Sequence, residues 1–141
     1  MHIRVLGSAA GGGFPQWNCD SPRCRAARSG RLVKERRSQS SIAVSQNGQQ
    51  WLLVNASPDI RQQILDNAVL HPSGAVRSSG IAAIALMDSQ IDHVTGLLMM
   101  RESNQPLAIY CTERTEEDLR SGFPNFEMLE HYCGVSIPHL P

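Results

Sequence analysis

Short segments in which hydrophobic and polar residues alternate mark the first third of the chain. Residues 2–7 alternate in this way and end at a glycine, which predicts a short first strand. Two further apolar runs, residues 41–45 and 50–54, lie on either side of Asn47 and Gly48. Because an Asn-Gly pair favours the tight turn that joins antiparallel strands, these runs predict a β-hairpin.

From residue 57 onward, the apolar spacing alternates between helical and extended patterns. Ser57 as N-cap and Pro58 at the first helical position predict a helix, with an apolar stripe that includes Ile60 and Ile64. Residues 81–86 are apolar on both faces and predict a buried strand. Further predicted elements are a helix over 94–100, a strand over 107–111 and two helices, from Thr115 and around Phe126. Strands followed by alternating helices and strands predict an α/β fold with layers around a mixed sheet, in one domain over 1–141.

The balance of charged residues argues against nucleic acid as a partner. Lys plus Arg equals Asp plus Glu at 13 each, and a neutral chain lacks the basic surface that nucleic acid requires. We interpret the one basic run, residues 23–37, as a solvated surface loop. The longest apolar stretches are too short to span a membrane, and the N-terminus does not resemble a signal peptide. We therefore expect a cytoplasmic protein whose four cysteines are free thiols or metal ligands.

The strongest chemical signal is the segment from Asp88 to Gly96. Asp92 and His93 follow the predicted buried strand directly and precede a helix, which is where α/β sheets present ligands to a site. A glycine three residues after His93 lets the helix pack closely against its neighbours. An Asp-His pair alone is common on polar loops, but at the tip of a strand it is a candidate metal site.

The spacing of this segment resembles the metal motif of the metallo-β-lactamase superfamily. That motif reads His-x-His-x-Asp-His, and here Asp88 and Gln90 stand at the two histidine positions before Asp92 and His93. In the superfamily the first two histidines hold one metal, and the Asp-His pair belongs to the second. The substitution therefore removes one metal site, because glutamine is a poor zinc ligand, and it leaves half of the other.

The same departure is found in the coenzyme PQQ synthesis protein B family, which the chain resembles along its length. Residues 5–19 are similar to the start of that family almost letter for letter, and residues 54–63 and 123–134 also resemble the family. Family members are about twice as long. The resemblance thus implies a metallo-β-lactamase-like αββα sandwich of which this chain is the truncated, N-terminal half.

The resemblance implies a role in making pyrroloquinoline quinone (PQQ) from a peptide-derived precursor, through iron-dependent hydroxylation of its tyrosine moiety. Asp92 and His93 would be catalytic and would ligate Fe(II) or another divalent metal. The third ligand is expected outside these residues, so the short chain would lack a complete site. One alternative is a carrier that transports PQQ or its precursor toward the periplasm without catalysis. Another is a metal-dependent phosphodiesterase, which needs two metals.

Three further expectations complete the picture. Cys19 and Cys24 resemble a zinc knuckle whose middle cysteine is replaced by Ser21, so they are a candidate structural zinc site, with two free thiols as the alternative. Trp17, on the glycine-rich loop after the first strand, is expected to line the active site together with Asp88 and Gln90. A half sandwich exposes an apolar sheet face, so we expect a homodimer through that face.

Overall fold

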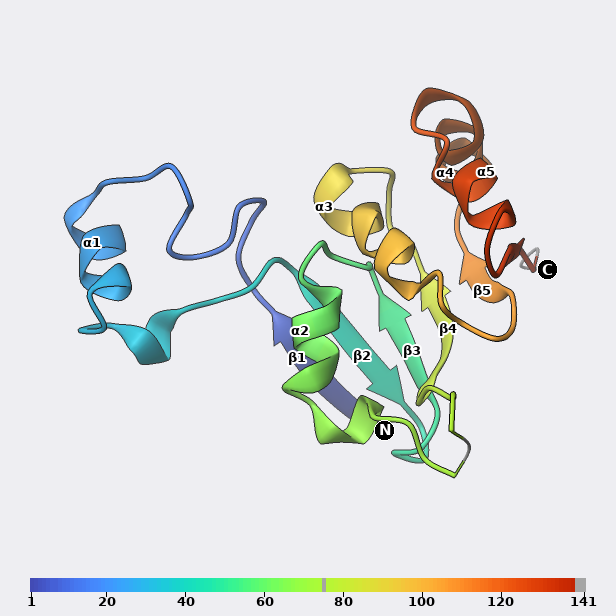
Figure 1. Ribbon diagram of the computed structural model, residues 1–141, viewed down its shortest axis with the longest axis horizontal. Coiled ribbons are helices and arrows are strands. Elements are labelled where there is room, and N and C mark those ends of the chain that lie inside the picture. Colours follow the sequence, from blue (N-terminus) through green and yellow to red (C-terminus); the bar gives the residue numbers. More distant parts are fainter. Residues whose placement is uncertain (75, 139–141) are drawn as a thin grey trace.

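The computed structural model describes residues 1–74 and 76–138, and it contains one six-stranded mixed sheet (Figure 1). The strands lie side by side in chain order: β1 (His2–Gly7), β2 (Ser41–Ser45), β3 (Trp51–Val54), β4 (Ile81–Ala85), β5 (Leu107–Tyr110) and β6 (Val135–Ser136). The first three strands are antiparallel neighbours, whereas β3 to β6 run parallel to one another. The α/β class predicted from the sequence is confirmed.

The predicted hairpin is present as β2 and β3. Its turn is fixed by side chains, because the hydroxyl of Ser45 accepts from the backbone N–H of Gly48 at 2.9 Å. The Oδ1 atom of Asn47 accepts from the backbone N–H groups of Gln49 and Gln50, at 2.9 and 3.0 Å. Gly48 has φ +74°, a conformation that glycine adopts without strain.

Short helices connect the parallel strands and pack on one face of the sheet (Figure 1). They are α2 (Ile60–Leu65), η2 (Ala68–Leu70), α3 (Ile91–Val94), η3 (Thr95–Met100), α4 (Glu113–Glu117), η4 (Asp118–Gly122) and α5 (Asn125–Glu130). The prediction that Ser57 caps α2 is wrong. The Ser57 side chain is buried and its hydroxyl donates to Oε1 of Gln63 at 3.0 Å, so the helix begins later, at Ile60.

The core lies between the sheet and these helices. Leu53, Ile84 and Ile109 point to this side from neighbouring strands and are buried against Leu97 and Phe126. The opposite face of the sheet is open. Paired positions form an apolar row of Ile3, Val44, Leu52 and Ala83, and a second row of Val5, Ile42, Val54, Ala85 and Tyr110. Ile3 and Val5 are 56% and 66% exposed.

The open face corrects the expectation for residues 81–86. Along β4 only Ile84 is buried, while Ala82 is exposed and the other three residues are half-buried. A run that is apolar on both sides therefore has one covered face here. The sequence pattern is that of a strand buried on both faces, which is what a second layer on the open side would produce.

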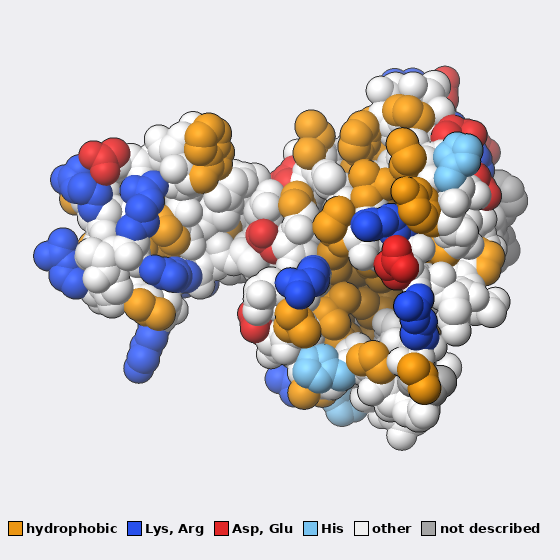
Figure 2. Space-filling model, viewed as in Figure 1, with side chains coloured by type: hydrophobic (Ala, Val, Ile, Leu, Met, Phe, Trp, Pro, Cys, Tyr) orange, Lys and Arg blue, Asp and Glu red, His pale blue; other side chains and the backbone are white. Residues whose placement is uncertain are grey.

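The basic run is not a loop throughout, as we expected, but contains a helix, α1 (Pro22–Arg28), followed by η1 (Val33–Glu35). Ser21 caps α1, because its hydroxyl accepts from the N–H of Cys24 at 3.3 Å, and Pro22 takes the first helical position. We call residues 17–37 the arm, since they project from the sheet body (Figure 1). Figure 2 shows Lys and Arg side chains gathered on it.

Two further observations concern the ends of the fold. β6 was not predicted, and it extends the sheet through the pair Leu107 and Val135. A strand of two residues carries too little periodicity to be recognised in a sequence. Within the described residues, the structure contains no helix that is long and apolar enough to cross a membrane.

Candidate functional site

The candidate site lies where the chain leaves β4, beside the carboxyl ends of the parallel strands β3 and β5. The loop there is held from both sides. The N–H of Leu86 donates to the carbonyl of Tyr110 at 2.8 Å, and the N–H of Met87 donates to Oδ1 of Asn55 at 3.0 Å. Asn55 adopts φ 59°, a left-handed conformation that asparagine tolerates better than most residues. These bonds fix the start of α3, which carries Asp92 and His93.

His93 is oriented by a carboxylate. Its Nδ1 lies 2.7 Å from Oδ1 of Asp88, and its side chain is 18% exposed. Gln90 donates to the same carboxylate, with its backbone N–H to Oδ1 and its side-chain amide to Oδ2, both at 3.0 Å. Burial by itself raises the pKa of Asp88, but these hydrogen bonds from Gln90 and His93 outweigh it and lower the pKa below its ordinary value.

In this arrangement Asp88 and Gln90 have a different role from the two histidines of the superfamily motif, which hold a metal. Both side chains are engaged with each other, and Asp88 also holds the ring of His93. A carboxylate on one ring nitrogen fixes the tautomer and leaves the other nitrogen, Nε2, to act as a ligand. The pattern Asp-x-x-x-x-His is the available sequence signal for this contact, whereas from the sequence we interpret Asp88 as a replaced ligand and as a residue that lines the site.

Asp92 faces the glycine-rich loop. A Cβ atom on Gly11 would lie 3.4 Å from Oδ2 of Asp92, so the loop backbone runs directly past the carboxylate. Asp92 is half-buried, and within the described residues it has no hydrogen-bond or ion-pair partner. A half-buried carboxylate without such a partner is suited to hold a cation.

Within the described residues, the donor set is incomplete for a metal ion. Among residues 1–74 and 76–138, no group of three or more His, Cys, Asp or Glu side chains is arranged to hold a metal. The residues present fit part of a mononuclear site, with one carboxylate from Asp92 and one imidazole from His93. That Asp92 and His93 ligate a metal, with a third ligand from another segment, stays a prediction.

The third residue expected at the active site is Trp17. It is on the arm and is 80% exposed, and neither of two cavities of about 800 and 770 Å³ is lined by Trp17, Asp92 or His93. Within the described residues, Trp17 has no hydrogen bond or ring contact with Asp88 or Gln90. Its role at an active site stays a prediction.

The two arm cysteines are neighbours at the start of α1. The thiol of Cys19 donates to the hydroxyl of Ser21 at 3.3 Å, and Cys24 is buried. Hydrogen bonds with Ser21, and a weaker one with Cys24, lower the pKa of Cys19 below its ordinary value. Two thiols and a hydroxyl thus gather in one place, and a fourth zinc ligand is absent among the described residues. Cys111 and Cys133, which have no role in either site, are free and half-buried.

Comparison of the sequence and the fold with known proteins identifies the superfamily. The model of the "Beta-lactamase superfamily domain" family matches residues 50–141. Among solved structures, the zinc-bound PqqB from Methylobacterium extorquens aligns with a TM-score of 0.87 and 44% identity, over 99% of this chain and 50% of that one. A diphosphatase of the PhnP family aligns with a TM-score of 0.74 at 24% identity, over 99% of this chain and 50% of that one, which reflects the shared fold alone.

Sequence relatives make the assignment more specific. Coenzyme PQQ synthesis protein B from Methylococcus capsulatus is 59% identical over 141 residues, which is all of this chain and 46% of the relative. The protein of the same name from Methylobacillus flagellatus is 55% identical over the same length, again 46% of that relative. The chain belongs to the β-lactamase superfamily and, within it, to the coenzyme PQQ synthesis protein B family. It spans about half the length of the curated relatives it matches.

Proposed function

We propose that the chain is part of a PQQ-biosynthesis protein that hydroxylates the tyrosine moiety of a peptide-derived precursor with the help of Fe(II). The observation that carries this proposal is the pair formed by Asp92 and His93, in which Asp88 orients the imidazole at 2.7 Å. Relatives of the same family, at 55–59% identity, support the pathway. The iron and the hydroxylation are our inference from the donor types.

The donor types distinguish between two metal chemistries. One carboxylate and two imidazoles around a metal with open positions is the ligand set of non-haem iron oxygenases. A hydrolase with two metals would need further histidines at positions 88 and 90, where Asp88 and Gln90 instead bond to each other. A phosphodiesterase is therefore disfavoured, and a single metal held by Asp92, His93 and one ligand from another segment is favoured.

Each residue of the site has a role that follows from its contacts. Asp92 and His93 would hold the metal, and Asp88 would keep the proton on Nδ1 of His93 so that Nε2 remains a ligand. Gln90 would hold the Asp88 carboxylate in place. When bound, iron supplies the redox chemistry that brings dioxygen to an aromatic ring. The glycine-rich loop beside Asp92 would limit the space for the substrate phenol.

The direct test is turnover by the complete protein. Purified complete protein loaded with Fe(II) should hydroxylate a tyrosine-bearing precursor under air when a two-electron reductant such as ascorbate is supplied, because one oxygen atom of dioxygen enters the ring and the other leaves as water. Asp92→Asn should abolish the product while the circular dichroism spectrum is unchanged. Equal activity of Asp92→Asn would refute the proposal. Tight binding of quinone or precursor without turnover under any metal would instead favour the carrier.

A second proposal concerns the open sheet face. The two apolar rows that cross β1 to β5 leave a continuous apolar surface, of a kind that soluble monomers rarely expose. For the 141-residue chain we infer that a second copy covers it in a two-fold dimer, because an isologous contact buries the same rows from both sides. The arm cysteines remain our candidate for structural zinc, and a cytoplasmic location is likewise a proposal.

A further inference from the structure

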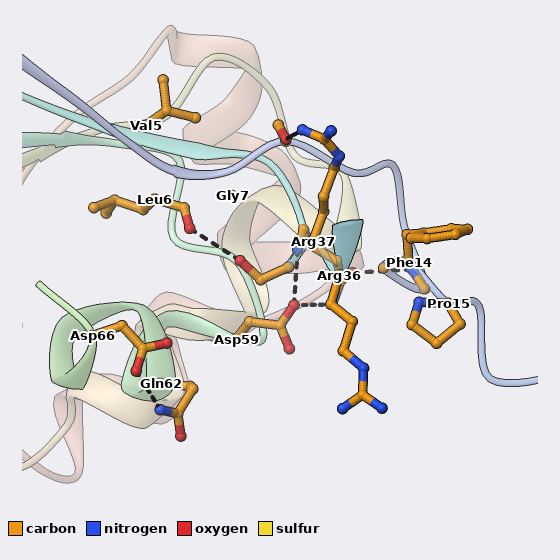
Figure 3. Close-up of a pocket in the computed structure, with 15 residues that line it drawn as sticks. Val5, Leu6, Gly7, Phe14, Pro15, Arg36, Arg37, Asp59, Gln62 and Asp66 are labelled. Carbon is orange, nitrogen blue, oxygen red and sulfur yellow. Dashed lines mark hydrogen bonds between the residues drawn. The ribbon is translucent and has the colours of Figure 1, made fainter. Parts of the chain in front are cut away.

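A cavity of about 800 Å³ lies between the end of β1, the glycine-rich loop, the base of the arm and the start of α2 (Figure 3). Its volume falls in the range of about 300–1,000 Å³ that is usual for small-molecule sites. The cavity is distinct from the Asp92 and His93 site, since neither residue lines it. The proposed function gives it no role.

Four charged side chains line this cavity without neutralising one another. Arg36 and Arg37 come from the base of the arm, and Asp59 and Asp66 come from either end of α2. None of the four takes part in an ion pair within the described residues. The cavity therefore presents two positive and two negative charges, and its net charge is zero.

Neutral groups hold Arg36 and Asp59 in position. The Arg36 guanidinium donates from Nε and Nη2 to the carbonyl of Ala27, at 3.3 and 3.0 Å, which leaves Nη1 free. Asp59 accepts through Oδ2 from the N–H and the side-chain amide of Gln39, at 2.8 and 3.2 Å, which leaves Oδ1 free. Figure 3 shows the Arg36 and Asp59 side chains reaching the cavity from different segments.

Arg37 and Asp66 are less available to a ligand. Nη1 of Arg37 donates to the hydroxyl of Ser8 at 3.3 Å, and Figure 3 shows this side chain extending away from Asp59. Asp66 is exposed, unlike the half-buried Asp59, and it accepts from the side-chain amide of Gln62 at 2.8 Å. The ligand contacts should therefore centre on Arg36 and Asp59.

Fixed charges of opposite sign select a ligand that carries both. A simple anion would be attracted by Arg36 but repelled by Asp59, and a simple cation would meet the reverse. A molecule with a carboxylate and an ammonium group satisfies both, with charge-assisted hydrogen bonds. Phe14 and Pro15 form an apolar part of the wall, and Arg23 lies over the Phe14 ring at 5.7 Å, which holds that side chain in place.

We propose that this cavity binds a free α-amino acid with an aromatic side chain. Its carboxylate pairs with Arg36, its ammonium group pairs with Asp59, and its ring packs against Phe14. The binding needs no metal, so its success or failure is independent of the hydroxylation proposed above.

Calorimetry with three probes that share one phenyl ring tests the proposal on the complete protein after metal removal. L-phenylalanine carries both charges, phenethylamine lacks the carboxylate and 3-phenylpropionate lacks the ammonium group. L-phenylalanine should bind, and each of the other two should bind at least about tenfold more weakly, because each leaves one protein charge without its partner. Absence of L-phenylalanine binding, or equal binding of all three probes, would overturn the proposal.

Two variants locate the contacts. In Arg36→Gln, L-phenylalanine should lose its advantage over phenethylamine but keep its advantage over 3-phenylpropionate, and Asp59→Asn should show the opposite pattern. Arg25→Gln is a matched control, because Arg25 pairs with Asp20 on the arm and does not line the cavity. An unchanged preference in both cavity variants would also overturn the assignment.

Discussion

The backbone N–H of Ala56 donates to the carbonyl oxygen of His93 at 2.7 Å, which joins the end of β3 to the first turn of α3. A second bond runs in the same place, from the N–H of Gly96 to the carbonyl of Ala56 at 2.9 Å. The two bonds bring the backbone of the metal-ligand segment against the backbone after β3. Only a residue without a side chain fits there, since a Cβ on Gly96 would lie 2.1 Å from the carbonyl oxygen of Ser57.

Gly96→Ala should therefore destabilise the protein. The added methyl group meets backbone atoms, which cannot move as a flexible side chain does, so we expect a loss of about 2–4 kcal/mol in the free energy of unfolding. Urea denaturation followed by circular dichroism measures it. Gly122→Ala is the matched control, because a Cβ there meets nothing within 4 Å. Equal stabilities of the two variants would contradict the packing described for Gly96.

Metal binding should depend on three residues to different degrees. Asp92→Asn and His93→Gln each remove a proposed ligand, and we expect the complete protein to lose its bound Fe(II). Asp88→Asn removes only the carboxylate that orients His93, so affinity should fall by about 10–100-fold rather than vanish. Metal titration of the purified protein distinguishes these outcomes. The exposed residue Glu113, changed to Gln, should bind as the unaltered protein does.

The sequence was informative where a local pattern determines the structure. The Asn47-Gly48 turn and the strands around it were predicted because the turn chemistry lies within a few residues. The position of Asp92 and His93 after β4 followed from one apolar run. The cap of α2 was missed because the Ser57 hydroxyl bonds to Gln63, and the same Ser-Pro signal at Ser21 and Pro22 was overlooked within a basic run.

Contacts between distant segments could not be predicted in the same way. The Arg36 and Asp59 cavity joins the arm base to α2, and its charges are separated by more than twenty residues of sequence. The approach of Gly11 to Asp92 likewise depends on how β1 pairs with β2 and β2 with β3. Local periodicity in the sequence does not predict these contacts, because they arise from tertiary packing.

Self-association through the open sheet face should be sensitive to charge. Leu52→Lys places an ammonium group in the middle of one apolar row, and burying it in an interface is costly. We expect the 141-residue chain to sediment as a dimer and the variant as a monomer. Leu65→Lys is the control, since Leu65 is 52% exposed on α2. A monomeric parent chain, or a dimer that both variants preserve, would argue against this interface.

Three of the thiols should differ in reactivity because their surroundings shift their pKa values in opposite directions. Hydrogen bonds from Ser21 lower the pKa of Cys19, whereas burial raises the pKa of Cys111, with a further contribution from Glu116, and also raises that of Cys133. Because the thiolate is the reactive form, iodoacetamide near neutral pH should modify Cys19 first, as mass spectrometry would detect.

A Ser21→Ala variant and added zinc show whether the arm cysteines are free thiols or metal ligands. Ser21→Ala removes the hydroxyl that stabilises the Cys19 thiolate, so the rate at Cys19 should fall toward that of an ordinary exposed thiol. The labelling is first done after treatment with a chelator and then with added zinc. If the arm cysteines bind zinc, the metal should protect Cys19 and Cys24 together while the slow reactions of Cys111 and Cys133 stay unchanged. Modification of Cys19 at the same rate with and without zinc would instead identify the pair as free thiols.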